Sequence, residues 1–145
     1  MTRAASFATI SAALGTGLPH LLGQFIVTVL LLVAGIAIYT AFTPYKESEL
    51  VRQDNTAGGI VYAGSIIALA IPLASLLATS GYLLDIIVWG VVALLIQLAT
   101  LAIVSWLLLR RLKVLIEGGN VAAALTVAAT QIAVALLNAA AMVPT

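Results

Sequence analysis

The chain has 145 residues, of which 63% are hydrophobic and 8% charged, and its mean hydropathy is +1.23. A soluble domain of this size has too much surface for its volume to bury so many apolar side chains, so composition excludes a soluble globular protein. A net charge of +1 argues against a nucleic-acid partner, which requires a dense basic patch, and the lack of cysteine excludes disulfides and thiolate chemistry.

The first 19 residues do not have the pattern of a cleaved signal peptide. Their apolar run, from Ala4 to Leu18, is interrupted by serine, threonine and glycine. Phe7, Ile10 and Leu14 nevertheless fall near one face of a helix. We expect either a short interfacial helix on the membrane surface or a loosely ordered tail.

Four later segments are long and apolar enough to cross a bilayer as helices, which takes about 20 residues each. They are residues 21–42, 58–79, 84–109 and 121–142. Their apolar runs are continuous rather than alternating, which favours helices over a closed barrel. We therefore predict a single all-α integral membrane domain, residues 1–145, with an N-terminal segment (1–19) and two halves (20–79 and 80–145).

Charged side chains gather in two short stretches, residues 46–54 and 110–117, and only Arg3 and Asp85 fall outside them. Four spans place both stretches on the same side of the membrane. That side carries five basic residues, against Arg3 alone on the other: Lys46, Arg52, Arg110, Arg111 and Lys113. Positive residues in short loops mark the cytoplasmic face, so we expect cytoplasmic loops and two periplasmic termini.

The two halves resemble each other when the chain is shifted by about 65 residues. Asn55 then aligns with Asn120, and each asparagine follows a charged stretch and begins an alanine-rich span. This order predicts two tandem, parallel two-helix repeats. Small residues permit close helix packing in lipid, so the second and fourth spans are expected to form the inner contact. The alternative is that alanine merely fills a helix.

Neutral polar residues occur within the predicted spans, whereas no charged residue lies well inside one, which argues against a proton-coupled transporter. Asn120, Gln131 and Asn138 lie near one line along the fourth span, and Gln97 marks a face of the third. These side chains are interpreted either as hydrogen-bonded packing between helices or as a polar path. Asn55 and Asn120 are candidate helix N-caps, with an anion site at the helix entrances as the alternative.

Residue patterns typical of catalysis are missing from the sequence. His20 is the single histidine, and no Ser/His/Asp set, phosphate loop or paired carboxylates occur. We therefore expect no enzyme, no cofactor and no metal site.

Three segments resemble the YjfL-like inner-membrane proteins, classed as domain of unknown function 350. They are the arginine-rich stretch with Glu117-Gly118-Gly119-Asn120-Val121-Ala122-Ala123-Ala124, the segment from Glu49 to Gly59, and Leu84-Asp85-Ile86-Ile87-Val88-Trp89-Gly90. The resemblance implies four spans in two tandem pairs in a bacterial inner membrane. It also implies a genomic setting beside membrane-stress proteins and amide ligases, and hence a role in envelope maintenance.

Two functions fit the sequence best, and a membrane domain that delivers a hydrophobic substrate to a separate enzyme is a third. The first is a non-enzymatic membrane scaffold or subunit that forms homo-oligomers or joins a membrane complex, and that docks a cytoplasmic protein through its two basic loops. The alternative is a small oligomeric channel or transporter with a neutral polar path along the fourth span. The lipid bilayer is the partner in both cases.

Overall fold

The computed structural model describes residues 2–43 and 47–143, with the side chains of that range except those of residues 2–6, 8 and 108–111. These residues form helices and no strand, as expected: α1 (Thr2–Phe42), α2 (Glu47–Arg52), α3 (Thr56–Thr79), α4 (Leu83–Val104), the π-helix η1 (Ser105–Leu109), α5 (Arg110–Glu117) and α6 (Val121–Ala141). Four helices are long and apolar enough to cross a membrane, which confirms the predicted class.

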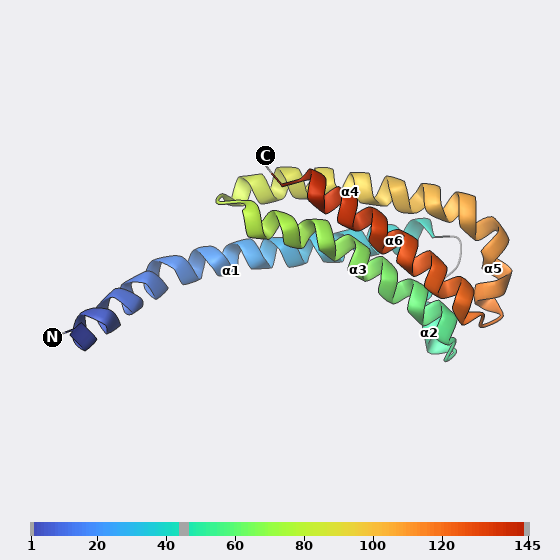
Figure 1. Ribbon diagram of the computed structural model, residues 1–145, viewed down its shortest axis with the longest axis horizontal. Helices are drawn as coiled ribbons and strands as arrows, with labels where there is room; N and C mark the ends of the chain where they lie inside the picture. The colour runs from blue at the N-terminus through green and yellow to red at the C-terminus, as the bar shows by residue number, and fades with distance from the viewer. Residues whose placement is uncertain (1, 44–46, 144–145) are drawn as a thin grey trace.

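The long helices run side by side, with α2 and α5 at one end of the bundle (Figure 1). The α3–α4 turn and the end of α6 lie at the opposite end. The most extensive contact in the bundle joins α3 to α6, and α1 packs against α4 and α3. Both charged stretches therefore lie on the side opposite the α3–α4 turn, as the four spans require.

Small residues at the α3–α6 contact allow the two backbones to approach closely. A Cβ atom added to Gly64 would lie 2.6 Å from Cβ and 2.9 Å from Cα of Ala128. Further along, the Ser75 hydroxyl donates a 3.2 Å hydrogen bond to the carbonyl of Ala139. The contact has the small-residue packing expected of membrane helices, and it confirms the predicted pairing of the second and fourth spans. Bulky side chains of α1 and α4, such as Leu30 and Leu95, stay exposed.

The N-terminal segment forms no separate helix, which corrects the expectation of a distinct interfacial element. Residues 2–42 make one helix of 41 residues, about 60 Å long, with Pro19 inside it. Proline at this position removes one amide donor, while the turns on either side keep their own hydrogen bonds. Nε2 of His20 lies 3.1 Å from the carbonyl oxygen of Gly81 and marks where α1 joins the bundle. The part before it extends past the bundle (Figure 1).

The two charged stretches are not loops, because residues 47–52 of the first and residues 110–117 of the second are helical. In α5, Leu112 and Ile116 lie one turn apart and pack against the core, while Lys113 and Glu117 form an ion pair at 3.7 Å on the outer face. An amphipathic pattern of this kind stabilises a short helix that has a core to rest on. The expected third span, residues 84–109, comprises α4 and η1, and α5 continues directly from it.

The turns that lead into α3 and α6 have the same hydrogen-bond pattern, 65 residues apart. The amide of Asn55 donates to the carbonyl of Leu50 at 3.0 Å, and that of Asn120 donates to Leu115 at 2.8 Å. The residue before each asparagine, Asp54 or Gly119, has a positive φ angle, 56° and 82° respectively. Each turn is a Schellman motif that ends one helix and starts the next.

Candidate functional site

A buried carboxyl group lies where α2 meets the membrane helices. Glu47, the first residue of α2, is 2% exposed, and its Oε1 accepts a 2.7 Å hydrogen bond from the hydroxyl of Tyr39 in the last turn of α1. The helix α2 packs on α3. A residue of a charged stretch thereby enters the interior of the bundle.

The Tyr39 hydroxyl connects this carboxyl to two further helices. Ser65 of α3 donates to it at 2.8 Å, and the side-chain amide of Gln131 of α6 lies within donating distance at 3.4 Å. Ser65 also lies 3.1 Å from Oε1 of Gln131 and 2.9 Å from the carbonyl of Val61. Ser65 and Gln131 are fully buried. One polar network therefore links α1, α2, α3 and α6.

The second oxygen of Glu47 gives this network an unusual electrostatic character. Oε2 is buried and has no hydrogen-bond partner among the described residues. Removing a carboxylate from water disfavours its charged form. Burial accordingly raises the pKa of Glu47 from its ordinary value of 4.5 to about 7, although the hydrogen bond from Tyr39 acts in the opposite direction. The carboxyl can therefore bind or release a proton near neutral pH.

A separate polar cluster joins α4 and α6. The amide of Asn138 donates to the carbonyl of Ala93 at 3.1 Å and to Oε1 of Gln97 at 3.3 Å. Gln97 is fully buried, and its own Nε2 has no partner in the described part of the chain. About two helical turns separate Asn138 from Gln131 along α6. The two clusters are thus centred at different depths in the bundle.

The four residues predicted to line a polar path take up three kinds of environment. Gln131 and Gln97 are fully buried within one bundle, Asn138 is almost fully buried, and Asn120 is exposed at the start of α6. The bonds from Gln131 and Asn138 run to neighbouring helices of the same chain. Hydrogen-bonded packing, the other interpretation of these residues, accounts for these contacts.

Both predicted N-caps are confirmed. The side chain of Asn55 accepts from the amide of Gly58 at 2.9 Å, and that of Asn120 accepts from Ala123 at 3.0 Å. Asn55 makes an additional contact, because its Nδ2 donates to the carbonyls of Ile116 at 3.2 Å and Glu117 at 3.0 Å. This asparagine therefore ties the start of α3 to the end of α5.

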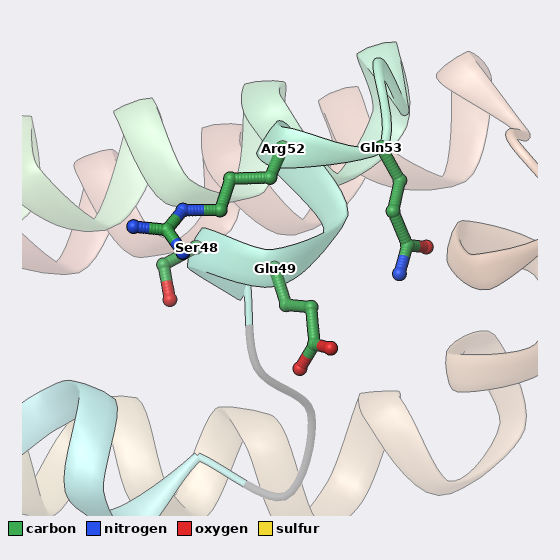
Figure 2. A pocket seen from close by; sticks show the side chains of 4 residues that line it. All are labelled: Ser48, Glu49, Arg52 and Gln53. Carbon is green, nitrogen blue, oxygen red and sulfur yellow. The ribbon is translucent and has the colours of Figure 1, made fainter.

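The outer face of α2 borders a hollow of about 540 Å³, lined by Ser48, Glu49, Arg52 and Gln53. Figure 2 shows Arg52 reaching back along α2 towards Ser48, with Glu49 and Gln53 pointing away in a similar direction. Arg52 is exposed, and Lys113 is partly exposed in its ion pair with Glu117. Of the other predicted docking residues, Lys46 lies outside the described residues, as do the side chains of Arg110 and Arg111.

Comparison with known proteins decides the family. The family model for the Domain of Unknown Function (DUF350) matches residues 13–142, which is most of the chain. The chain belongs to this family. The resemblance noted in the sequence is thereby confirmed.

Two related chains are the inner membrane proteins YjfL (UPF0719) of Escherichia coli strain K12 and of Escherichia coli O157:H7. Each is 31% identical over 118 residues, which cover 81% of this chain and 89% of the relative. No solved structure matches the chain. Together with the four apolar helices, these relatives support a multi-pass inner membrane protein.

Sequence reasoning missed the Tyr39–Glu47 pair in this DUF350 chain. Glu47 lies among charged residues and outside every apolar run, so its composition predicts a solvated position. The sequence did contain one signal of this pair. Tyr39 lies in the last turn of an apolar helix, and its phenolic hydroxyl needs a hydrogen-bond partner when it is buried. The identity of that partner depends on the fold-back of α2, which local sequence does not reveal.

Proposed function

We propose that this chain is a non-catalytic subunit of the bacterial inner membrane that docks a cytoplasmic protein on the surface formed by α2 and α5. The observation that carries the proposal is the pair of hydrogen bonds from Asn55 to the carbonyls of Ile116 and Glu117. These bonds span 61 and 62 residues of the chain, and they tie the residue that follows the first charged stretch to the end of the second.

Charge supports this choice of surface. In the sequence, the two charged stretches hold five of the six basic residues of the chain. By the positive-inside tendency, the α2–α5 end faces the cytoplasm, where a soluble partner can reach it. The hollow beside α2 presents Arg52 and Glu49 together, so the surface suits a partner of mixed charge. Exposed ion pairs each contribute about 0–1 kcal/mol, so we expect a modest affinity that weakens with salt.

The proposal includes a duplicated architecture. Matching Schellman turns and matching asparagine caps, each 65 residues apart, support two tandem parallel units of two spans. The duplication explains why both charged stretches reach the same end of the bundle. Homo-oligomers, or assembly with other membrane subunits, would use the exposed apolar faces of α1 and α4, where residues such as Leu30 and Leu95 are uncovered.

Photo-cross-linking in living cells tests the docking surface. A photoreactive amino acid would replace Gln53, which lines the hollow, or Tyr82 at the opposite end of the bundle. We expect a discrete product from position 53 and none of the same size from position 82. A product of twice 14.9 kDa would instead indicate a second copy of this chain at the surface and contradict docking of a different protein.

Charge variants sharpen this test. Arg52→Glu combined with Lys113→Glu reverses two charges, and we expect the product from position 53 to be lost. Arg52→Lys combined with Lys113→Arg keeps both charges and serves as the matched control, with the product retained. A product that survives charge reversal, or one that forms equally at position 82, would refute docking through the α2–α5 end.

A further inference from the structure

The helix α2 is anchored at its two ends in different ways. At its C-terminal end, Leu50 packs against Gly58, where an added Cβ atom would lie 2.6 Å from Cβ of Leu50. The Schellman turn from Leu50 to Asn55 fixes the same end to α3. At its N-terminal end, the polar contact with α1 is the 2.7 Å hydrogen bond between Tyr39 and Glu47. The second anchor therefore depends on one carboxyl group.

Among the described residues, the groups that hydrogen-bond with this carboxyl, directly or through Tyr39, are uncharged. The groups that face it are the phenol of Tyr39 from α1 and, through that phenol, the hydroxyl of Ser65 from α3 and the amide of Gln131 from α6. The charged neighbours on α2 itself, Glu49 and Arg52, lie on its exposed face. Within the described residues, no cation forms a salt bridge with Glu47, and its Oε2 has no hydrogen-bond partner.

We propose that Glu47 is a proton-binding latch, which holds α2 on the bundle while the carboxyl is protonated and releases the N-terminal end of α2 when the carboxyl ionises. A neutral carboxyl can stay buried beside Tyr39 at low cost, whereas a carboxylate with one unsatisfied oxygen favours a position in water. The turn at Asn55 keeps the other end in place. Release therefore swings α2, and the hollow that it borders, away from α1.

The direction of the pH effect follows from the two protonation equilibria. When α2 is docked, burial raises the pKa of Glu47 to about 7, and when α2 is released the carboxyl returns to its ordinary value of 4.5. Below the lower value both states are protonated, so pH has no effect. Between the two values the released state loses its proton first, and the ratio of docked to released molecules falls about tenfold per pH unit. In total, the ratio of docked to released molecules falls about 300-fold, and the fall is complete once the pH passes 7.

A distance measurement in the full-length protein tests the latch without any partner. The chain has no cysteine, so Ser48→Cys on α2 and Val114→Cys on α5 would carry two spin labels at exposed positions of the same end. In lipid nanodiscs, double electron–electron resonance should give a narrow distance distribution near the lower pKa. A second, broader population should grow as the pH rises to about 8. A distribution that stays unchanged across this range would overturn the proposal.

Two carboxyl-to-amide variants in the same labelled background separate the latch from general effects of pH. Glu47→Gln imitates the protonated carboxyl, so its distribution should stay narrow at every pH. Glu49→Gln makes the same chemical change on the exposed face of α2, and it should respond to pH like the parent. If the distance distribution of Glu47→Gln broadens with pH as that of the parent does, the group whose protonation controls α2 is not Glu47. Should Glu47→Gln fail to assemble in nanodiscs, the parent and Glu49→Gln titrations still decide whether α2 moves in the expected window.

The outcome is independent of the docking proposal, because no partner is present in the experiment. If no partner cross-links at position 53 but α2 still moves with pH, the docking proposal is rejected and the latch stands. A rigid α2 with cross-linking intact would reject the latch alone.

Discussion

The hydroxyl of Tyr39, in the last turn of α1, donates a 2.7 Å hydrogen bond to Glu47, the first residue of α2. These two residues are eight positions apart, and one belongs to an apolar spanning helix while the other begins a charged stretch. The bond places a carboxyl at the end of the membrane bundle, in contact with a network that reaches α3 and α6. The charged end and the membrane core are therefore one connected structure.

Removing the Tyr39 hydroxyl should destabilise the protein. Tyr39→Phe leaves both oxygens of Glu47 without a hydrogen-bond donor in the described structure, and an unsatisfied buried acceptor costs about 1–3 kcal/mol. We expect the free energy of unfolding in detergent micelles, measured by circular dichroism near pH 5, where Glu47 is protonated and α2 is docked, to fall by that amount. Tyr62→Phe is the matched control, because the half-buried Tyr62 makes no such contact with Glu47. Equal losses from the two variants would rule out a special role for Tyr39.

The stability of the whole chain should depend on pH through Glu47. Its pKa is raised in the folded state, so the folded state binds the proton more tightly than the unfolded state does. The resulting stabilisation is fully present below the ordinary carboxyl pKa of 4.5, and it is lost as pH rises through about 7. The total effect is about 3 kcal/mol. Unfolding curves across this range should show it in the parent, and Glu47→Gln should remove that part of the dependence; an unchanged slope in the variant would contradict the assignment.

Much of the architecture could be predicted because lipid imposes simple rules on a chain. A span needs a long apolar run, so composition alone locates the four spanning helices. Asn55 and Asn120 are recognisable caps, because each stands between a charged stretch and an alanine-rich run. The α3–α6 contact was also predictable, since small residues such as Gly64 are what close helix packing requires.

Other features depend on tertiary contacts that no local pattern encodes. Leu112 and Ile116 make α5 a helix because a core lies beneath them, whereas the charged residues of the same stretch predict a loop. The burial of Glu47 depends on α2 folding back towards Tyr39, a reversal that composition does not indicate. The continuity of α1 was missed because serine, threonine and glycine interrupt the apolar run before residue 19. The helix nevertheless continues through Pro19, since one lost amide donor does not break a helix of this length.

Because α3 and α6 approach each other closely at Gly64, substitution of Gly64 by alanine should destabilise the protein, whereas the same substitution at Gly59 should not. Gly64→Ala would place a Cβ atom 2.9 Å from the backbone Cα of Ala128, so the helices must separate, at a cost of about 1–3 kcal/mol. Gly59→Ala, in the same helix, meets no atom nearer than Val51 Cγ2 at 3.9 Å, and should be neutral or stabilising by about 0.5–1 kcal/mol. Thermal unfolding in detergent distinguishes the two variants. If Gly64→Ala is as stable as the parent, the α3–α6 contact is looser than its geometry indicates.

The two cap asparagines should differ in importance although their turns match. Asn120→Ala loses a helix cap, which costs about 1 kcal/mol. Asn55→Ala loses an equivalent cap and also two hydrogen bonds to the carbonyls of Ile116 and Glu117, which brings the expected loss to about 2–3 kcal/mol. Unfolding free energies of the two variants provide the comparison. Equal losses would mean that the bonds from Asn55 to α5 contribute nothing.

The orientation of the bundle can be determined with single cysteines, because the natural chain contains none. Gln53→Cys lies at the charged end beside α2, and Tyr82→Cys lies at the α3–α4 turn of the opposite end, where the tyrosine is 74% exposed. Basic residues favour the cytoplasmic side, so a membrane-impermeant thiol reagent added to intact cells should label position 82 and spare position 53. Position 53 should react only after the inner membrane is permeabilised. Labelling of position 53 but not of position 82 in intact cells would mean that the charged end faces the periplasm. The proposed docking surface would then be beyond the reach of any cytoplasmic partner.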